Sequence, residues 1–309
     1  MKNPRRARRL FEGPMTDATA QIETEAVRIA GEPGRTPFVF ASPHSGRHAP
    51  VDIGVAAGVT AEEIGSADDV LVDALIAGGA AMGATLVLAG ISRAYVDMNR
   101  SADEIDPELT PGVAGGGARA AGGYGVIHRL SGRGRALYDR PISQEEARAR
   151  IEAVHAPYHA ALAQVVETAR DRFGYAVLID WHSMPTGPRG RGASQVVLGD
   201  RHGGACTGGL TREARRLFEA AGLITALNSP YAGGWTTQSW GRPDEGLHAL
   251  QVEIARPLYL DAAGAAPGPG FDRTRRIVER VMAGLLALGP DVFGAAHKKT
   301  AAGAAVKSL

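Results

Sequence analysis

Two histidines and a glutamate of this 309-residue chain stand at apolar runs in a way that suggests metal chemistry. The run FVFAS leads to His44, the run AVLID leads to His182, and the run ALQVEIA contains Glu253. A carboxylate inside a buried strand costs several kcal/mol unless it is paired or functional. Imidazoles and a carboxylate are parts of a hydrolytic zinc site, where the metal activates a water and a carboxylate takes its proton.

Each of these signals also has a structural interpretation. A single histidine after a strand is more often a capping or core residue than a ligand. Asp180 can orient the imidazole two residues later by accepting its second ring N–H. Asp69 fits a metal site, but its spacing from Ser66 equally fits a capping box at a helix N-terminus. His155 and His159 lie four residues apart on a predicted helix and are expected to pack rather than to bind metal.

Basic side chains near the same strand ends indicate an anionic substrate, because guanidinium groups bind carboxylates through paired hydrogen bonds. Asn99 and Arg100 close the stretch SRAYVDMNR directly after the run TLVLAG, and this position favours substrate binding over surface solvation. Arg93, Arg129 and Arg256 are further candidates. For the last two, solvation at the surface is an equally good interpretation.

The elements that must position these residues alternate along the chain. Apolar runs rich in Val, Ile, Leu or Phe predict buried strands at 38–42, 85–90, 176–180, 194–199 and 249–255. Helices are predicted to begin at the capping boxes of Thr60, Ser66 and Ser143. Strands that alternate with helices predict an α/β fold of three α/β/α layers, with a mostly parallel or mixed central sheet.

The third capping box starts a long helix from 144 to 173, which Pro157 is expected to kink or split. Two more helices are predicted at 210–222 and 271–289. The Gly-rich stretches 111–125 and 187–194 predict long loops, which are candidate lids.

The chain is predicted to contain one domain between two flexible ends. Residues 1–20 are interpreted as a disordered basic extension, 21–292 as a single domain, and 293–309 as a flexible tail. The basic N-terminus has no apolar segment of the kind found in secretory signals, and Met15 is an alternative start to Met1.

Composition excludes several classes of partner. The formal charge of +1 gives no general electrostatic reason to expect nucleic acid or a membrane surface. No apolar stretch approaches the roughly 20 residues needed to span a bilayer. The single cysteine, Cys206, cannot form an intrachain disulfide and is typical of a reducing compartment. A cytoplasmic protein with a small-molecule substrate is expected; the oligomeric state is left open.

A family resemblance rests on a series of motifs in order between about residues 38 and 290. They are SPHSG, ADDVLVDAL, SRAYVDMNR, APYHAAL, DWHSMP, VVLGDRHG, NSPYAGG and LQVEIARPLY. Together they resemble the N-formylglutamate amidohydrolase family, which is similar in fold to the zinc carboxypeptidases and the aspartoacylase group.

The resemblance implies one zinc ion per chain, with His44 and His182 as two of its ligands. Position 47 is Arg47, so the His-x-x-Glu ligand pair of the carboxypeptidases is absent. The acidic ligand is therefore assigned to Asp69, with Asp68 as the alternative.

The resemblance also implies roles for the remaining candidates. Glu253 falls where these hydrolases keep their general base, and Asn99 with Arg100 resembles the pair that holds a substrate carboxylate. Arg93 or Arg129 is expected to hold the second carboxylate.

The implied reaction is hydrolysis of N-formyl-L-glutamate at the end of histidine degradation. Trp181 and Pro185 are hypothesised to brace the turn that carries His182. Two alternatives stay open: a zinc amidohydrolase for another N-acyl amino acid, and a catalytically silent carboxylate-binding protein.

Overall fold

A mixed β-sheet lies at the centre of the computed structural model, which describes residues 26–49, 54–185 and 193–294. Its strand order is β1-β3-β2-β4-β7-β5-β6. The strands are β1 (Val27–Ala30), β2 (Phe38–Ser42), β3 (Thr85–Ala89), β4 (Ala176–Met184), β5 (Val196–Gly199), β6 (Thr225–Leu227) and β7 (Leu247–Ala255).

The middle of the sheet is parallel and its edges are not. Strands β3, β2, β4 and β7 run in the same direction, and β1 is antiparallel to β3. At the other edge, β5 is antiparallel to β7 and pairs in parallel with β6. The predicted mixed sheet is thus confirmed. Since the four parallel strands end at one edge of the sheet, side chains from the loops after them can meet there.

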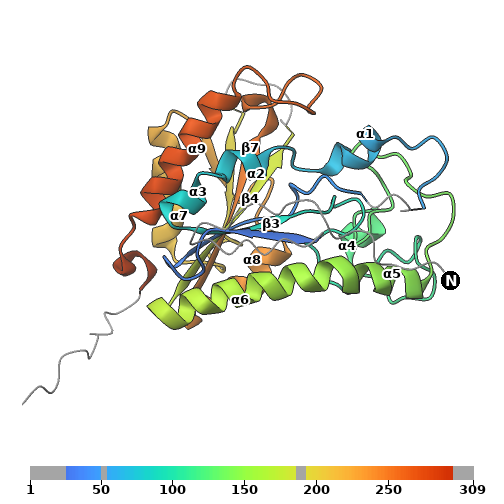
Figure 1. The fold of residues 1–309 in the computed structure, drawn as a ribbon, viewed down its shortest axis with the longest axis horizontal. Helices are drawn as coiled ribbons and strands as arrows, with labels where there is room; N and C mark the ends of the chain where they lie inside the picture. The colour runs from blue at the N-terminus through green and yellow to red at the C-terminus, as the bar shows by residue number, and fades with distance from the viewer. Residues whose placement is uncertain (1–25, 50–53, 186–192, 295–309) are drawn as a thin grey trace, which may run out of the picture.

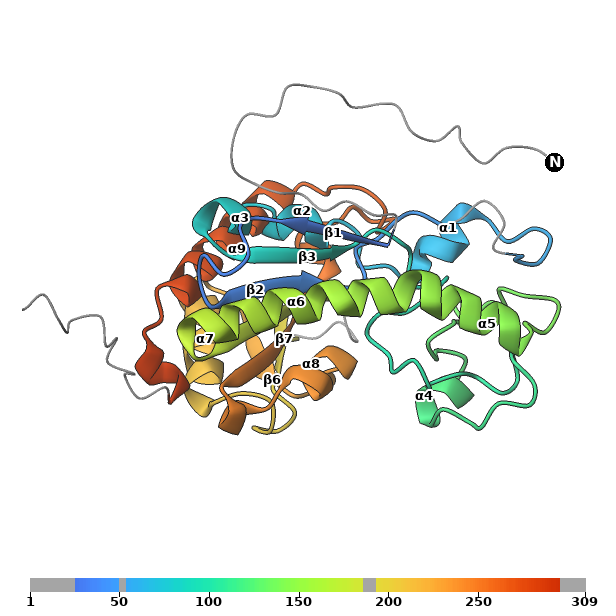
Figure 2. The ribbon, with the colours of Figure 1, turned by 60° about the horizontal axis from the view of Figure 1, so that its bottom comes forward.

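Helices cover both faces of the sheet, which confirms the three predicted layers (Figure 1). One face packs against α2 (Val72–Ile76), α3 (Gly79–Met82), α7 (Gly208–Ala220) and α9 (Phe271–Leu286). The other face packs against α6 (Ala156–Phe173) and α8 (Trp235–Trp240). The short helices α1 (Ala61–Ile64), α4 (Ala118–Ala121) and α5 (Gln144–Arg150) lie beyond the carboxyl ends of the parallel strands (Figure 2).

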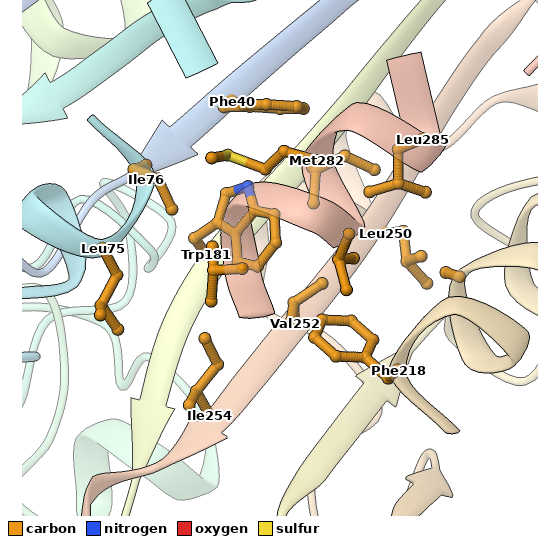
Figure 3. Close-up of a cluster of buried hydrophobic side chains, with 14 of the residues drawn as sticks. Phe40, Leu75, Ile76, Trp181, Phe218, Leu250, Val252, Ile254, Met282 and Leu285 are labelled. Carbon is orange, nitrogen blue, oxygen red and sulfur yellow. The ribbon is translucent and has the colours of Figure 1, made fainter. Parts of the chain in front are cut away.

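The core on the α7 and α9 side is built around Trp181. Its ring is fully buried and meets the edges of Phe40 and Phe218 at centroid distances of 5.9 and 6.4 Å. Aliphatic side chains from β7 and α9, among them Val252 and Met282, surround it (Figure 3). Aromatic rings contribute most buried area per residue, so this cluster anchors β4 against the helices.

The alternation of side chains along β4 and β7 decides which residues reach the opposite face. Val177, Ile179 and Trp181 point into the α7 and α9 core, so Asp180 and His182 point the other way. On β7, Leu250, Val252 and Ile254 enter the same core, which leaves Gln251 and Glu253 on the side of Asp180 and His182.

This alternation corrects one prediction. The strand predicted at 176–180 continues to Met184, so His182 lies inside β4 and no turn is braced by Trp181 and Pro185. The abrupt change from apolar to polar residues marks a strand with two different faces, and not the end of a strand.

Two of the three predicted helix starts are confirmed. The hydroxyls of Thr60 and Ser143 accept hydrogen bonds from the backbone N–H groups of Glu63 and Glu146. The start at Ser66 is wrong. Its hydroxyl donates to the carbonyl of Glu63, and α2 begins only at Val72, after Leu71 in the left-handed conformation (φ 65°).

The predicted long helix is divided where Pro157 led us to expect a disturbance. A π-helical turn, Ile151–His155, joins α5 to α6. Pro157 has no N–H to donate to the preceding turn, which favours such a change in the hydrogen-bond pattern.

The remaining differences concern short elements and ends. Strands β1 and β6 escaped prediction because three or four residues carry too little pattern. Within the Gly-rich stretch 111–125 lies α4, whereas most of the predicted loop 187–194, the predicted extension 1–20 and most of the predicted tail 293–309 are outside the described residues. Phe293, predicted to start the tail, is buried against Phe38. None of the described helices has the length and apolar character that crossing a membrane requires.

Replacing Trp181 with Ala tests the anchoring of β4. We expect a loss of about 3–5 kcal/mol in the free energy of unfolding, because a large buried ring leaves a cavity that its neighbours cannot fill. Urea unfolding of the metal-free protein measures this loss. Met82→Ala, at a side chain that is 38% exposed, is the control and should change stability by less than about 1 kcal/mol. A similar small loss for both variants would contradict the role of Trp181.

Candidate metal centre

Three buried side chains from separate parts of the chain converge at the carboxyl end of the parallel strands. His44 follows β2, Asp69 precedes α2, and His182 lies on β4. One ligand atom from each lies within 4.8 Å of the others. The Asp69 backbone N–H donates to the carbonyl of His44 at 2.8 Å, so the first two are also held together through their main chains.

Both imidazoles present Nδ1 to the same carboxylate oxygen. Nδ1 of His182 lies 3.0 Å from Oδ2 of Asp69, and Nδ1 of His44 lies 3.4 Å from it. Their rings stand 4.7 Å apart between centroids. Two imidazole nitrogens and one carboxylate oxygen form the ligand set of catalytic zinc sites, in which a fourth position stays open for water or substrate.

The other ring nitrogen of each histidine is bonded to a second carboxylate. Nε2 of His44 lies 2.6 Å from Oδ1 of Asp97, and Nε2 of His182 lies 2.9 Å from Oδ2 of Asp180. When a metal is bound, Nε2 of each ring would carry the proton that its carboxylate accepts, and Nδ1 would offer its lone pair to the ion. In the metal-free protein burial opposes the charged form of His182, but Asp180 and Asp69 raise the pKa of His182 well above its ordinary value.

An unsatisfied atom supports a metal at this position. Nδ1 of His44 is buried and forms no hydrogen bond within the described residues. A buried polar atom without a partner is costly, and a cation bound by His44, Asp69 and His182 would satisfy it. The residues present therefore fit a divalent metal ion.

Charge balance holds Asp69 in its ionised form. Burial alone would raise the pKa of Asp69, but His182 and His44 hold it well below its ordinary range. Ser183 and Arg256 donate to its other oxygen, each at 3.1 Å. The carboxylate is thus fully engaged, which suits a ligand whose orientation must not change.

Asp68, the alternative acidic ligand, faces a different set of partners. Its carboxylate accepts hydrogen bonds from the Ser92 hydroxyl at 2.9 Å and the Arg93 backbone N–H at 3.1 Å. It does not belong to the group of atoms around His44 and His182. Burial raises the pKa of Asp68 to about 7. Between the two candidates the geometry favours Asp69.

Glu253 stands beside His182 across the β4–β7 ladder, in register with it. Its carboxyl group is buried, and Gln251 donates to it at 2.8 Å. Burial raises the pKa of Glu253 to about 7, although the charge of His182 opposes the shift. A carboxylate with a pKa near neutrality can both take and return a proton.

The three candidate ligands and Glu253 line one cavity of about 360 Å³. The cavity wall also carries four arginines, Arg93, Arg100, Arg119 and Arg256. Such a volume is ample for a small metabolite, and the cationic wall favours an anionic one.

The arginines are not equally free to bind substrate. Arg93 donates twice to Asp97, and Arg256 is engaged by Asp69 and Ser183. Arg100 donates to the backbone carbonyls of Asn99 and Tyr124. Arg119, on α4, is exposed, and its guanidinium forms no hydrogen bond or ion pair within the part of the chain that is described.

The structure does not bring Arg129 to the cavity. Its guanidinium is paired with Asp106 at 2.6 Å and with Glu108 at 2.9 Å. Asn99 does line the cavity, but its amide is already bonded: the oxygen accepts from the Thr236 backbone N–H, and the nitrogen donates to Oδ2 of Asp180 at 3.4 Å, the oxygen that also faces Nε2 of His182. Asn99 therefore supports the metal centre from beside the ring of His182.

Sequence reasoning assigned no role to Asp97, although its carboxylate accepts more hydrogen bonds than that of Asp69. Besides His44, its carboxylate accepts from the Asn99 backbone N–H, from Arg93 and from His128. Burial would raise the pKa of Asp97, but Arg93 and the other cationic neighbours hold it well below its ordinary range. The one available signal was its place inside the stretch SRAYVDMNR.

The cavity and the fold together define a class of protein: a hydrolytic enzyme with a candidate metal centre at the carboxyl ends of parallel strands in an α/β/α domain. The family model described as N-formylglutamate amidohydrolase matches residues 36–260. The chain belongs to this family.

Individual relatives agree with this assignment. The N-formylglutamate deformylase of Pseudomonas aeruginosa is 30% identical over 270 residues, which span 84% of this chain and 96% of that protein. The protein of the same name from Pseudomonas putida is 29% identical over 236 residues, 74% of this chain and 83% of its own.

Solved structures extend the comparison to the fold. The crystal structure of an N-formylglutamate amidohydrolase from Ralstonia eutropha JMP134 has 34% identity and a TM-score of 0.79, covering 85% of this chain and 98% of its own. The gene product Atu2144 of Agrobacterium tumefaciens, at 19% identity and a TM-score of 0.57, shares the fold.

Asp97→Asn tests the support of His44 without changing side-chain shape. We expect metal affinity to fall about 10- to 100-fold, because the amide cannot accept the imidazole proton as strongly. Competition with a zinc indicator measures the affinity. Asp200→Asn, at another hydrogen-bonded carboxylate outside the cavity, is the control and should leave the affinity unchanged. Equal affinities for all three proteins would remove Asp97 from the metal centre.

Proposed function

We propose that the protein hydrolyses N-formyl-L-glutamate to formate and L-glutamate, with one Zn²⁺ held by His44, Asp69 and His182. The observation that carries this proposal is the placement of Glu253 in the same cavity as these three side chains, on the strand next to His182. The relatives named for this reaction support the choice of substrate.

Zinc, when bound, supplies a Lewis acid for the formyl carbonyl and lowers the pKa of water. The remaining work falls to the side chains of the cavity. Glu253 takes the proton of the attacking water and returns it to the departing nitrogen of glutamate. Burial of Glu253 keeps its pKa close to neutrality, so both transfers are feasible near pH 7.

The arginines divide into two functional groups. Arg93 and Arg256 are fixed by Asp97 and Asp69, next to the candidate ligands. We assign to them the stabilisation of the negative charge that develops on the carbonyl oxygen, because fixed cations stabilise such charge without reorganising.

Arg100 and Arg119 lie on the side of the cavity that α4 and Tyr124 border. We assign the two substrate carboxylates to these two residues. Arg119 replaces Arg129 in this role, because Arg129 is paired outside the cavity and Arg119 is unpaired in the described structure.

Glu253→Gln tests the assignment of the general base. We expect the variant to keep its metal and to lose about 10²- to 10⁴-fold in kcat, because the amide cannot accept a proton. Formate release together with metal content measures both effects. Glu108→Gln, at an exposed glutamate outside the cavity, should behave as the parent protein. A Glu253→Gln variant with near-normal kcat would place the base elsewhere.

Two monoamides of the substrate, N-formylglutamine and N-formylisoglutamine, test the assignment of the carboxylates. Each lacks one carboxylate, so the parent protein should hydrolyse both with a lower kcat/KM than N-formylglutamate. Arg100→Gln and Arg119→Gln should each lose discrimination against one monoamide, and not the same one, because each guanidinium binds one carboxylate. Discrimination retained in both variants would show that other residues bind the carboxylates.

A further inference from the structure

Two histidines outside the cavity hold the segment that carries Asn99 and Arg100. His155 ends the π-helical turn before α6, and His159 lies one turn later on α6; both rings face this segment. Nε2 of His155 is 2.9 Å from the carbonyl oxygen of Arg100, and Nε2 of His159 is 2.8 Å from the carbonyl oxygen of Met98. The two bonds thus fix the peptide group before Asn99 and the peptide group after Arg100.

The chemistry of these contacts leaves a single hydrogen-bonding state. A carbonyl oxygen only accepts, so each imidazole must carry its proton on Nε2. Burial lowers the pKa of His155, and it lowers the pKa of His159 to about 4. Both rings are therefore neutral at pH 7 and act as fixed donors to the backbone.

The local backbone conformation explains the direction in which the His155 side chain points. It is the last residue of the π-helical turn Ile151–His155, which directly precedes α6. A π-helical turn inserts one extra residue and rotates the side chains that precede it relative to those that follow. The two rings come to lie 4.2 Å apart between centroids, with both Nε2 atoms directed at the 98–100 segment.

The segment held in this way touches both halves of the proposed site. The amide of Asn99 donates to Asp180, the carboxylate bonded to His182, and accepts from the backbone of Thr236. The Arg100 guanidinium lines the cavity, and its own backbone carbonyl is the one bonded by His155. A shift of this segment would move the guanidinium relative to the candidate metal centre.

We propose that His155 and His159 are positioning residues that clamp the 98–100 segment and so set the distance between Arg100 and the metal centre. The proposal rests on the function proposed above, in which Arg100 binds a substrate carboxylate. Neither histidine touches substrate. Their effect is exerted through the carbonyl oxygens of Arg100 and Met98.

The test compares side chains that differ only in their ability to reach these carbonyls. Glutamine places its amide N–H groups near the position of Nε2, asparagine places them about one bond short, and leucine has no donor. We therefore make the Leu, Asn and Gln variants at His155 and at His159. His248→Leu is the matched control, since His248 is buried on β7 and its ring forms no hydrogen bond within the described residues.

The first readout is the ratio of kcat/KM for N-formylglutamate to kcat/KM for the monoamide that Arg100 discriminates against. One lost hydrogen bond should lower this ratio roughly 3- to 10-fold in the Leu and Asn variants. The Gln variants should restore it, and His248→Leu should leave it unchanged. General weakening of the fold would lower both rates together and would not move the ratio.

The second readout needs no turnover: calorimetric binding of glutarate, a plain dicarboxylate, to the metal-free protein. We expect glutarate to bind the Leu and Asn variants with a Kd about 3- to 10-fold higher than the parent protein. Because His155 acts through Arg100, adding His155→Leu to Arg100→Gln should not raise the Kd further. If the parent protein binds glutarate but does not hydrolyse N-formylglutamate, the proposed function is wrong, while the glutarate Kd values still test the positioning role of the two histidines.

The clamp itself is overturned by either of two results. One is an unchanged ratio and an unchanged glutarate Kd in the Leu and Asn variants of an active protein. The other is equal behaviour of the Asn and Gln variants. If a Leu variant does not accumulate in folded form, the comparison of Asn with Gln at the same position decides the question.

Discussion

The site depends on the burial of three carboxylates, Asp69, Asp97 and Asp180, in a region with almost no access to water. An isolated buried carboxylate is strongly unfavourable, so each requires hydrogen-bond donors and opposite charge. The histidine rings and Arg93 supply part of this compensation, and a divalent cation would supply the rest. The same electrostatic requirement therefore explains the ligand geometry and the arginines around it.

Asp97 shows how this requirement organises the loops. Its two oxygens receive five donors from four residues, His44, Arg93, Asn99 and His128. These donors belong to the loops after β2 and β3 and to the Gly-rich region beyond α4. The parallel strands bring the loops to one edge of the sheet, and the buried charge then fixes their mutual positions.

The sequence predicted the residues whose type is rare in their surroundings. His44, His182 and Glu253 stood out because polar groups seldom occur in such apolar runs, and the structure brings all three to one cavity. Asp69 was ambiguous, because a capping box and a metal ligand have the same local spacing. The capping box is excluded by the Ser66 hydroxyl, which donates to the Glu63 carbonyl, and by the left-handed Leu71, which delays the start of α2; no sequence pattern announces that conformation.

Pairing in space was the part that could not be predicted. Arg119 lies within the Gly-rich stretch 111–125 and Arg129 lies just after it, yet one is paired with Asp106 and the other is not. Strands β1 and β6 are too short for a periodic signal, and their existence follows from the sheet that they extend.

The strict alternation along β4 also constrains how this chain can vary. Trp181 and His182 are neighbours that serve opposite sides of the sheet, and Glu253 stands opposite His182 in the adjacent strand. Inserting or deleting one residue upstream in β4 would turn the indole toward the polar cavity and bury the imidazole among aromatic rings. Length changes are thus confined to the connecting loops, while β4 and β7 must keep their residue count.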